Sequence, residues 1–256
     1  MTDQQETLST SGQVSGKMFL YQQPELLTPD IHGSMGFTPS KRPYDFVRNE
    51  RVIPLTMTEF SSAQRHYPII FSNIDNPMPL AVTGLLDETN LFVDADGQWD
   101  PMSYVPMYLK CYPFTFAHEG GGRVAVVVDR AADTVTENPE YPFFVGENVS
   151  EHTDQLMRLC AQYDAERRRT VDYTTKLKEL GLLAPLRAAY TPEGKTEQEP
   201  LAEYIGIDTE KFNELSKDQV WELHETGFLA TTYLQIYSLE NWQHLMARLQ
   251  LRKQAA

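Results

Sequence analysis

The pattern of apolar residues changes near residue 148, and this change limits what the chain can fold into. Before it, short apolar runs alternate with clusters of turn residues, which is typical of β-strands. After it, apolar residues recur at helical spacing over residues 149–183. Because strands come first and helices second, the sequence predicts an α+β fold. Its first half is expected to hold mainly antiparallel or mixed sheet, and its second half helices with one β-hairpin.

The first half is expected to contain several short strands behind a proline-rich arm. Residues 17–48 contain four prolines with aromatic residues between them, which favours an extended arm over a core. The strands are predicted within residues 51–56, 67–72, 79–86, 90–94 and 123–129. The last run is apolar on both faces and is expected to be fully buried. Thr58 is expected to cap a short helix over residues 58–67.

The second half is expected to be helical apart from its hairpin. Helices are predicted at residues 149–183, 208–215 and 217–251, the last interrupted near Gly227 and Ser238, and the hairpin strands at 183–191 and 200–207. Ser150 and Asp208 carry side chains that cap helix N-termini, and Gly181 suits a helix C-terminus.

The same patterns indicate where the chain divides. We predict a disordered tail at residues 1–16, a β-rich region at 17–147 and a helical region with a hairpin at 148–256. One continuous domain explains the patterns equally well.

The chain is strongly acidic, with 22 Lys and Arg against 36 Asp and Glu and a formal net charge of −14. Such a chain is expected to repel nucleic acid and anionic lipid surfaces, and its apolar runs are too short for membrane insertion. Cys111 and Cys160 stand far apart and are expected to be buried thiols. The N-terminus does not resemble a secretory signal, so we expect a cytoplasmic location. The alternative is the cell surface, reached by a signal-independent route.

The stretch LFVDADGQWD, residues 91–100, resembles the start of a calcium loop. Asp94 and Asp96 could be its first two ligands, but Gly97 follows at once and the twelfth position is Val105, which has no carboxylate. An Asp-Gly pair between strand-forming residues favours a tight turn instead, because glycine readily adopts positive φ.

Other candidate sites are incomplete. His152 and Asp154 match the opening of an iron-binding triad, but they fall in the first turn of a helix, where residues two apart point in different directions. The run HEGGGR, residues 118–123, resembles an oxyanion loop, yet the chain lacks the G-x-S-x-G motif that such a site needs. We therefore predict neither a metal site nor a cofactor, and no catalytic residue can be named.

Aromatic residues gather just beyond the Asp-Gly pair. Trp99 is followed by Tyr104, Tyr108 and Tyr112, whose i, i+4, i+8 spacing would place three phenols on one helical face. One interpretation is a stripe that packs into the core. The other, which we adopt, is that these four residues line a groove for a peptide, a sugar or a ring-shaped ligand.

Several segments of the chain resemble the bacterial SapC family. They are YPIIFSN (67–73), GLLDETNLFVDADGQWD (84–100), YVPMYLKCYPF (104–114) and HETGFLATTYLQIYSLENWQHL (224–245). The resemblance covers most of the chain after residue 17. The family's name implies a link to bacterial surface layers, and the resemblance supplies no catalytic residues.

Three functions are consistent with these observations. We favour a non-catalytic accessory or binding protein in which a groove lined by these four aromatic residues takes a small molecule, a peptide or a protein partner. The alternatives are a structural protein associated with the surface layer, and an enzyme whose site is dispersed along the sequence. Apolar helical faces near residues 228–251 either pack into the core or leave room for a homo-oligomer.

Overall fold

The computed structural model describes residues 18–85, 89–118, 124–191 and 196–255, and the predicted tail lies outside these residues. The chain divides into two compact units. The first comprises the chain up to Val47, Asp96–Gln98 and Leu109–Ala165, and the second comprises Arg48–Ala95, Trp99–Tyr108 and Glu166–Ala256. Each unit takes segments from both sides of residue 148. That residues 17–147 and 148–256 form separable domains stays a prediction.

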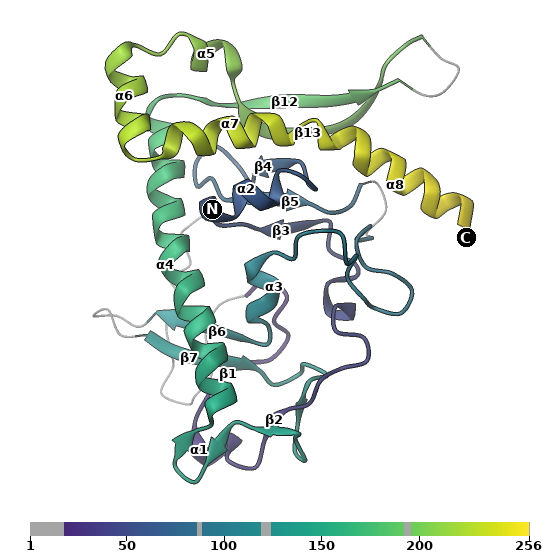
Figure 1. Cartoon of the computed structure of the whole chain (residues 1–256), viewed down its shortest axis with the longest axis vertical. Coiled ribbons are helices and arrows are strands. Elements are labelled where there is room, and N and C mark those ends of the chain that lie inside the picture. Colours follow the sequence, from purple (N-terminus) through teal and green to yellow (C-terminus); the bar gives the residue numbers. More distant parts are fainter. Residues whose placement is uncertain (1–17, 86–88, 119–123, 192–195, 256) are drawn as a thin grey trace. The chain divides into compact units, whose positions relative to one another are not determined.

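The first unit is built on short antiparallel strands (Figure 1). One sheet has the order β1 (Pro24–Leu26), β7 (Val124–Asp129), β6 (Phe114–His118), and another has the order β8 (Val135–Thr136), β2 (Gly36–Phe37), β9 (Tyr141–Pro142). β10 (Phe144–Val145) pairs with β11 (Asn148–Val149), and the unit also contains α1 (Pro29–His32) and η1 (Asp45–Val47). The proline-rich arm therefore supplies strands to both sheets, because β1 and β2 pair with later segments.

Burial within β7 is uneven. Val127, Val128 and Asp129 are fully buried, but Val124 is 46% exposed. The prediction that this strand is buried on both faces is therefore wrong for its first part, where β7 pairs with the end of β6.

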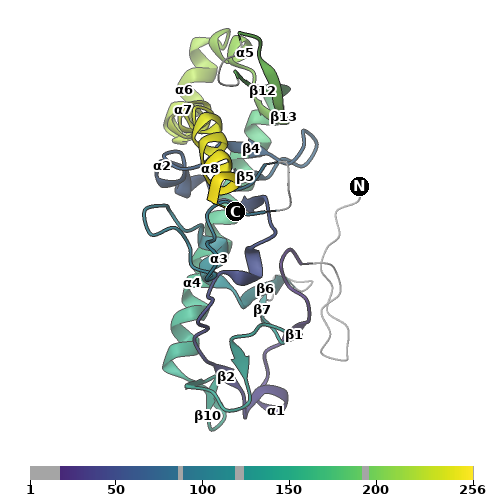
Figure 2. The same ribbon diagram turned by 90° about the vertical axis from the view of Figure 1, so that its right-hand side faces the viewer.

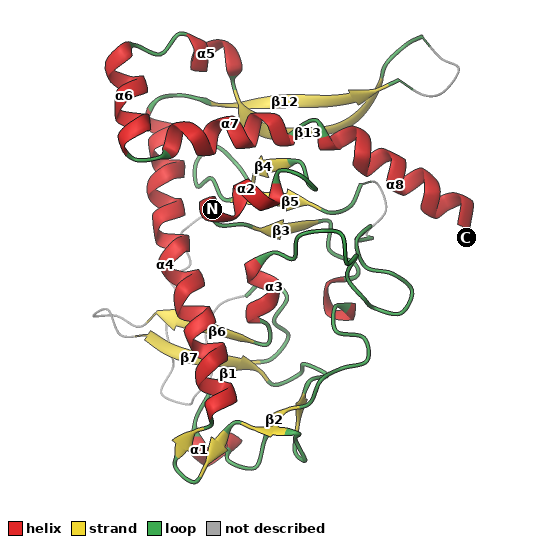
Figure 3. Cartoon of the chain, in the orientation of Figure 1, coloured by secondary structure: helices red, strands yellow, loops and turns green. Residues whose placement is uncertain are grey.

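The second unit is built on a five-stranded antiparallel sheet (Figures 1 and 3). Its order is β12 (Leu183–Tyr190), β13 (Glu199–Ile207), β4 (Ile69–Phe71), β5 (Pro79–Val82), β3 (Val52–Pro54). The helices of this unit are η2 (Met57–Glu59), α2 (Phe60–Ala63), α5 (Thr209–Asn213), α6 (Lys217–Glu225), α7 (Phe228–Ser238) and α8 (Asn241–Ala255). β12 and β13 form the expected hairpin, so the predicted α+β class is confirmed.

Helix α7 lies beside the sheet (Figure 2) and completes the hydrogen bonding of β4. The Gln235 amide donates to the Ile69 carbonyl at 2.8 Å, and the Ile69 N–H donates to the Ser238 hydroxyl at 2.9 Å. Both side chains are fully buried. They take the place of a strand partner, because buried backbone groups need hydrogen bonds.

Helix α4 (Glu151–Glu179) contributes its first half to the first unit and its second half to the second. The predicted cap is confirmed, since the Ser150 hydroxyl accepts a hydrogen bond from the Thr153 N–H at 3.2 Å. Gly181 follows the helix with a φ of +67°. Asp208 caps α5 as expected. The predicted cap at Thr58 is wrong: Thr56 caps η2, because Glu59 completes a capping box with it.

Buried aromatic clusters form much of the core of both units. In the second unit the ring of Tyr173 packs edge-on against Phe60 and Phe228, with centroids 6.0 and 5.4 Å apart. In the first unit Phe114 packs edge-on against Phe143 at 5.3 Å. Within the described residues, no helix is long and apolar enough to cross a membrane.

The Asp-Gly pair forms the expected turn. Gly97 has a φ of +73°, and Val93 and Trp99 on either side of it form an antiparallel bridge. The turn also approaches Arg42 closely: a Cβ at position 97 would lie 2.7 Å from the Arg42 Cβ. Glycine is required here both by the backbone angle and by the space.

We expect Gly97→Ala to lower the free energy of unfolding by about 1–3 kcal/mol, because alanine at this φ is strained and must also displace Arg42. Gly146→Ala is the matched control, since Gly146 has a φ of +64° but nothing within 4 Å of an added Cβ. Urea denaturation of the two variants measures the difference. Equal losses would show that the contact with Arg42 has no energetic weight.

Candidate functional site

The three predicted tyrosines do not share a helical face, so that prediction is wrong. Helix α3 spans only Met107–Cys111, with Tyr104 before it and Tyr112 after it. Proline sets both limits: Pro106 precedes the helix, and Pro113 disfavours helical backbone at Tyr112. Tyr104 and Tyr108 belong to the second unit, and Tyr112 belongs to the first.

Trp99 and Tyr104 both contact other residues of the second unit, Trp99 by ring stacking and Tyr104 by a hydrogen bond. Trp99 is 6% exposed and stacks on Phe92, with ring centroids 5.9 Å apart. The Tyr104 hydroxyl donates to Glu59 Oε1 at 3.0 Å, and burial together with this carboxylate raises the pKa of the phenol. That Trp99, Tyr104 and Tyr108 contact a ligand stays a prediction.

Tyr112 lines a cavity of about 340 Å³ in the first unit, which we call the aromatic groove. Four rings line it: Phe37, Tyr44, Phe46 and Tyr112. Each of them is partly exposed, in contrast to the fully buried rings of the core. Partly exposed aromatic rings that line one cavity are typical of sites that bind small molecules.

Two of these rings are already stacked on each other. The centroids of Phe46 and Tyr112 lie 4.0 Å apart with 14° between the ring planes. Tyr44 lies 6.4 Å from Phe46 and tilted by 31°, and Tyr21 packs edge-on against Tyr112 at 5.5 Å. The ring of Tyr112 is therefore held on two sides by other rings.

A buried carboxylate, that of Asp129, holds the hydroxyl group of Tyr112. Its hydroxyl donates to Asp129 Oδ2 at 3.0 Å, and burial, followed by this negative charge, raises the pKa of the phenol. Asp129 is fully buried and also accepts hydrogen bonds from the N–H groups of Gln22, Gln23 and Ala131, at 3.0, 2.8 and 3.2 Å. Four donors thus converge on one carboxylate, which ties the N-terminal arm to the wall of the groove.

The charged residues that line the groove balance one another. Arg42 and Lys110 contribute two positive charges, and Asp45 and Asp133 contribute two negative charges. Arg42 and Asp45 also form an ion pair with an N–O distance of 3.0 Å. Burial raises the pKa of Tyr44, so both groove tyrosines remain neutral at physiological pH. The charged side chains of the lining therefore sum to no net charge.

Of the four rings that line the groove, the sequence patterns predicted only Tyr112 as a site residue. Phe37, Tyr44 and Phe46 come from the proline-rich arm, more than sixty residues before Tyr112. The aromatic residues between the prolines of that arm are the sequence feature that could have indicated the other three rings. No sequence pattern predicts that the arm folds beside Tyr112. That position depends on the hydrogen bonds from the arm to Asp129 and on the pairing of β1 with β7, which join segments far apart in the chain.

The other sequence candidates have structural partners. The ring of His152 stacks on Tyr141, with centroids 4.5 Å apart, while Asp154 forms an ion pair with Arg158 at 2.7 Å. In the described part of the chain, no group of three or more His, Cys, Asp or Glu side chains could hold a metal ion. Both cysteines are buried, as expected. Of the run HEGGGR, residues 119–123 lie outside the described residues.

Comparison with curated proteins and with solved structures finds no match to this chain. A protein-family model described as SapC matches residues 27–245. The match includes the proline-rich arm from Leu27 onward, most of each unit, and the C-terminal helices as far as Leu245. It therefore covers every ring of the aromatic groove as well as the five-stranded sheet, and the chain belongs to the SapC family.

Proposed function

We propose that this protein binds a small, uncharged ligand with a planar ring in the aromatic groove. The observation that carries the proposal is the convergence of four partly exposed rings on one cavity of about 340 Å³. A volume of this size accepts one or two fused rings. The charged side chains of the lining can donate and accept hydrogen bonds, and because their charges cancel they do not favour an ion.

Stacking is the interaction that this geometry offers. Phe46 and Tyr112 lie nearly parallel at 4.0 Å and both line the cavity, so a planar ring bound there would join an existing stacked pair. Each aromatic pair contributes about 0.5–1.5 kcal/mol beyond the burial of its area. Because Asp129 and Tyr21 hold Tyr112 in place, the ligand does not have to order the wall that it binds.

The test compares planar and non-planar probes of similar size. We expect indole and adenosine to show saturation transfer from the protein in ligand-observed NMR, and cyclohexanol to show much less, because only a flat ring can stack. Tyr44→Ala is expected to weaken binding of the planar probes about threefold to tenfold. Equal signals from cyclohexanol would contradict the proposal.

A matched variant separates groove binding from general adhesion to exposed rings. Tyr237 is 57% exposed on α7 and does not line the groove. Tyr237→Ala should leave the dissociation constants of indole and adenosine unchanged. If Tyr237→Ala weakens binding as much as Tyr44→Ala, the probes are binding at the surface and the groove is not the site.

A further inference from the structure

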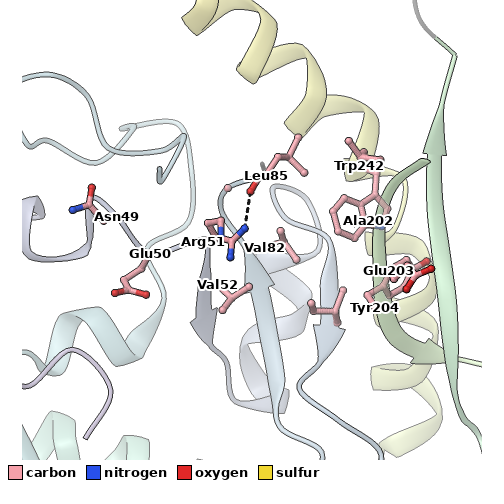
Figure 4. Close-up of a pocket in the computed structure, with 13 residues that line it drawn as sticks. Asn49, Glu50, Arg51, Val52, Val82, Leu85, Ala202, Glu203, Tyr204 and Trp242 are labelled. Atoms are coloured by element: carbon pink, nitrogen blue, oxygen red, sulfur yellow. Dashed lines mark hydrogen bonds between the residues drawn. The ribbon is translucent and has the colours of Figure 1, made fainter. Parts of the chain in front are cut away.

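A second and larger cavity lies over one face of the five-stranded sheet in the second unit (Figure 4). Its volume is about 590 Å³, and we call it the sheet pocket. Its floor is aliphatic: Val52, Ile70, Val82 and Leu85 come from β3, β4, β5 and the segment after β5. Val52 and Val82 are register partners, so their side chains point to the same face.

The two ends of the floor differ in chemistry. At one end are the rings of Tyr204 and Trp242, with centroids 5.3 Å apart. At the other end is Arg51, whose Nη1 donates to the Leu85 carbonyl at 3.3 Å. Figure 4 shows its guanidinium turned toward Leu85 and the pocket. An elongated ligand would therefore meet a positive charge at one end and apolar groups along the rest.

The backbone holds Arg51 in this position. Its carbonyl accepts hydrogen bonds from the N–H groups of Thr83 and Gly84, at 2.7 and 3.1 Å. Gly84 leaves room for the side chain, because a Cβ there would lie 3.0 Å from Arg51 Cγ and 2.1 Å from the Thr89 carbonyl oxygen. The backbone of Arg51 is thus fixed before a ligand binds, and the hydrogen bond to the Leu85 carbonyl orients the guanidinium.

The acidic residues of the lining do not neutralise Arg51. Glu203 forms an ion pair with Arg187 at 2.9 Å, and in Figure 4 the Glu50 carboxylate points away from Arg51. Among the described residues, Arg51 makes one side-chain hydrogen bond, to Leu85. As far as the described part of the chain shows, most of its five N–H donors remain for an anion, and a guanidinium can bind a carboxylate with two parallel hydrogen bonds.

From this arrangement we propose that the sheet pocket binds a small carboxylate that carries an apolar chain. The carboxylate binds the Arg51 guanidinium, and the chain lies over the aliphatic floor toward Trp242. The proposal does not depend on the aromatic groove, which belongs to the other unit.

Octanoate is the probe, and 1-octanol is its uncharged match. Trp242 lines the pocket, so binding can be followed by tryptophan fluorescence and confirmed by calorimetry. We expect octanoate to bind more tightly than 1-octanol. Arg51→Gln should weaken octanoate about tenfold to a hundredfold, the effect of losing a charge-assisted hydrogen bond, and should leave 1-octanol unchanged. Unchanged binding of 1-octanol also shows that the variant keeps its fold.

Two further variants complete the test. Arg158→Gln removes an exposed arginine of the first unit and should not change octanoate binding. Ala202→Phe fills the pocket from β13 without changing a charge, and should abolish binding of both probes. The proposal fails if wild-type protein does not bind octanoate at millimolar concentration. It also fails if Arg51→Gln binds octanoate like wild type, or if Ala202→Phe leaves binding intact.

Discussion

Replacing Asp129 with alanine is expected to lower the free energy of unfolding by about 3–5 kcal/mol, since each donor left buried without a partner costs about 1–3 kcal/mol. The fully buried carboxylate accepts hydrogen bonds from the N–H groups of Gln22, Gln23 and Ala131 and from the Tyr112 hydroxyl. Urea denaturation measures the loss. Hydrogen exchange locates it, and the amides of Gln22 and Gln23 should lose protection most.

Two variants make this expectation specific. Asp129→Asn keeps one acceptor oxygen but turns an NH₂ group toward backbone N–H donors, so its cost should be smaller, about 1–3 kcal/mol. Asp133→Ala removes the same charge from an exposed residue of the same unit and should change stability by less than about 0.5 kcal/mol. If Asp129→Ala is no worse than Asp133→Ala, then Asp129 does not hold the arm in place.

The fold follows most closely from the sequence where the controlling interaction is local. Ser150 and Asp208 bind N–H groups three residues ahead of them, so their chemistry can be recognised within one helical turn. Gly227, at a φ of +76°, separates α6 from α7 as expected, because glycine adopts this angle at little cost. The hairpin of β12 and β13 is also a local pairing.

Predictions failed where a second local signal competed with the first. The i, i+4, i+8 spacing of the tyrosines favoured a helical stripe, but Pro106 and Pro113 restrict the helix to five residues. Thr58 has the side chain of a cap, yet Thr56 is three residues before Glu59 and so can form a capping box with it.

The candidate sites could not be assembled from the sequence, because both depend on contacts between distant segments. The sheet pocket exists because β13 pairs with β4 through Ile205 and Phe71, which are more than a hundred residues apart. The aromatic groove needs the arm to fold beside Tyr112. No periodicity encodes such pairings. Aromatic residues are evident in both segments of the sequence, but which of them contact each other is not.

Glu59 has in the second unit the role that Asp129 has in the first. It is 4% exposed, and its two carboxylate oxygens accept four hydrogen bonds. Oε2 binds the N–H and the hydroxyl of Thr56, at 2.8 and 2.9 Å, and Oε1 binds the Tyr104 hydroxyl and the Met107 N–H, at 3.0 and 2.7 Å. One side chain therefore joins the start of η2 to the start of α3.

We expect Glu59→Ala to lower the free energy of unfolding by about 3–5 kcal/mol, because two backbone N–H groups and two hydroxyls lose a buried acceptor. The amides of Thr56 and Met107 should exchange faster, whereas those of Gln22 and Gln23, which bind Asp129, should respond less than they do in Asp129→Ala. Glu240→Ala, at an exposed position of the same unit, should have little effect on stability. Unchanged protection at Met107 in Glu59→Ala would mean that the hydrogen bonds of Glu59 do not hold the start of α3 in place.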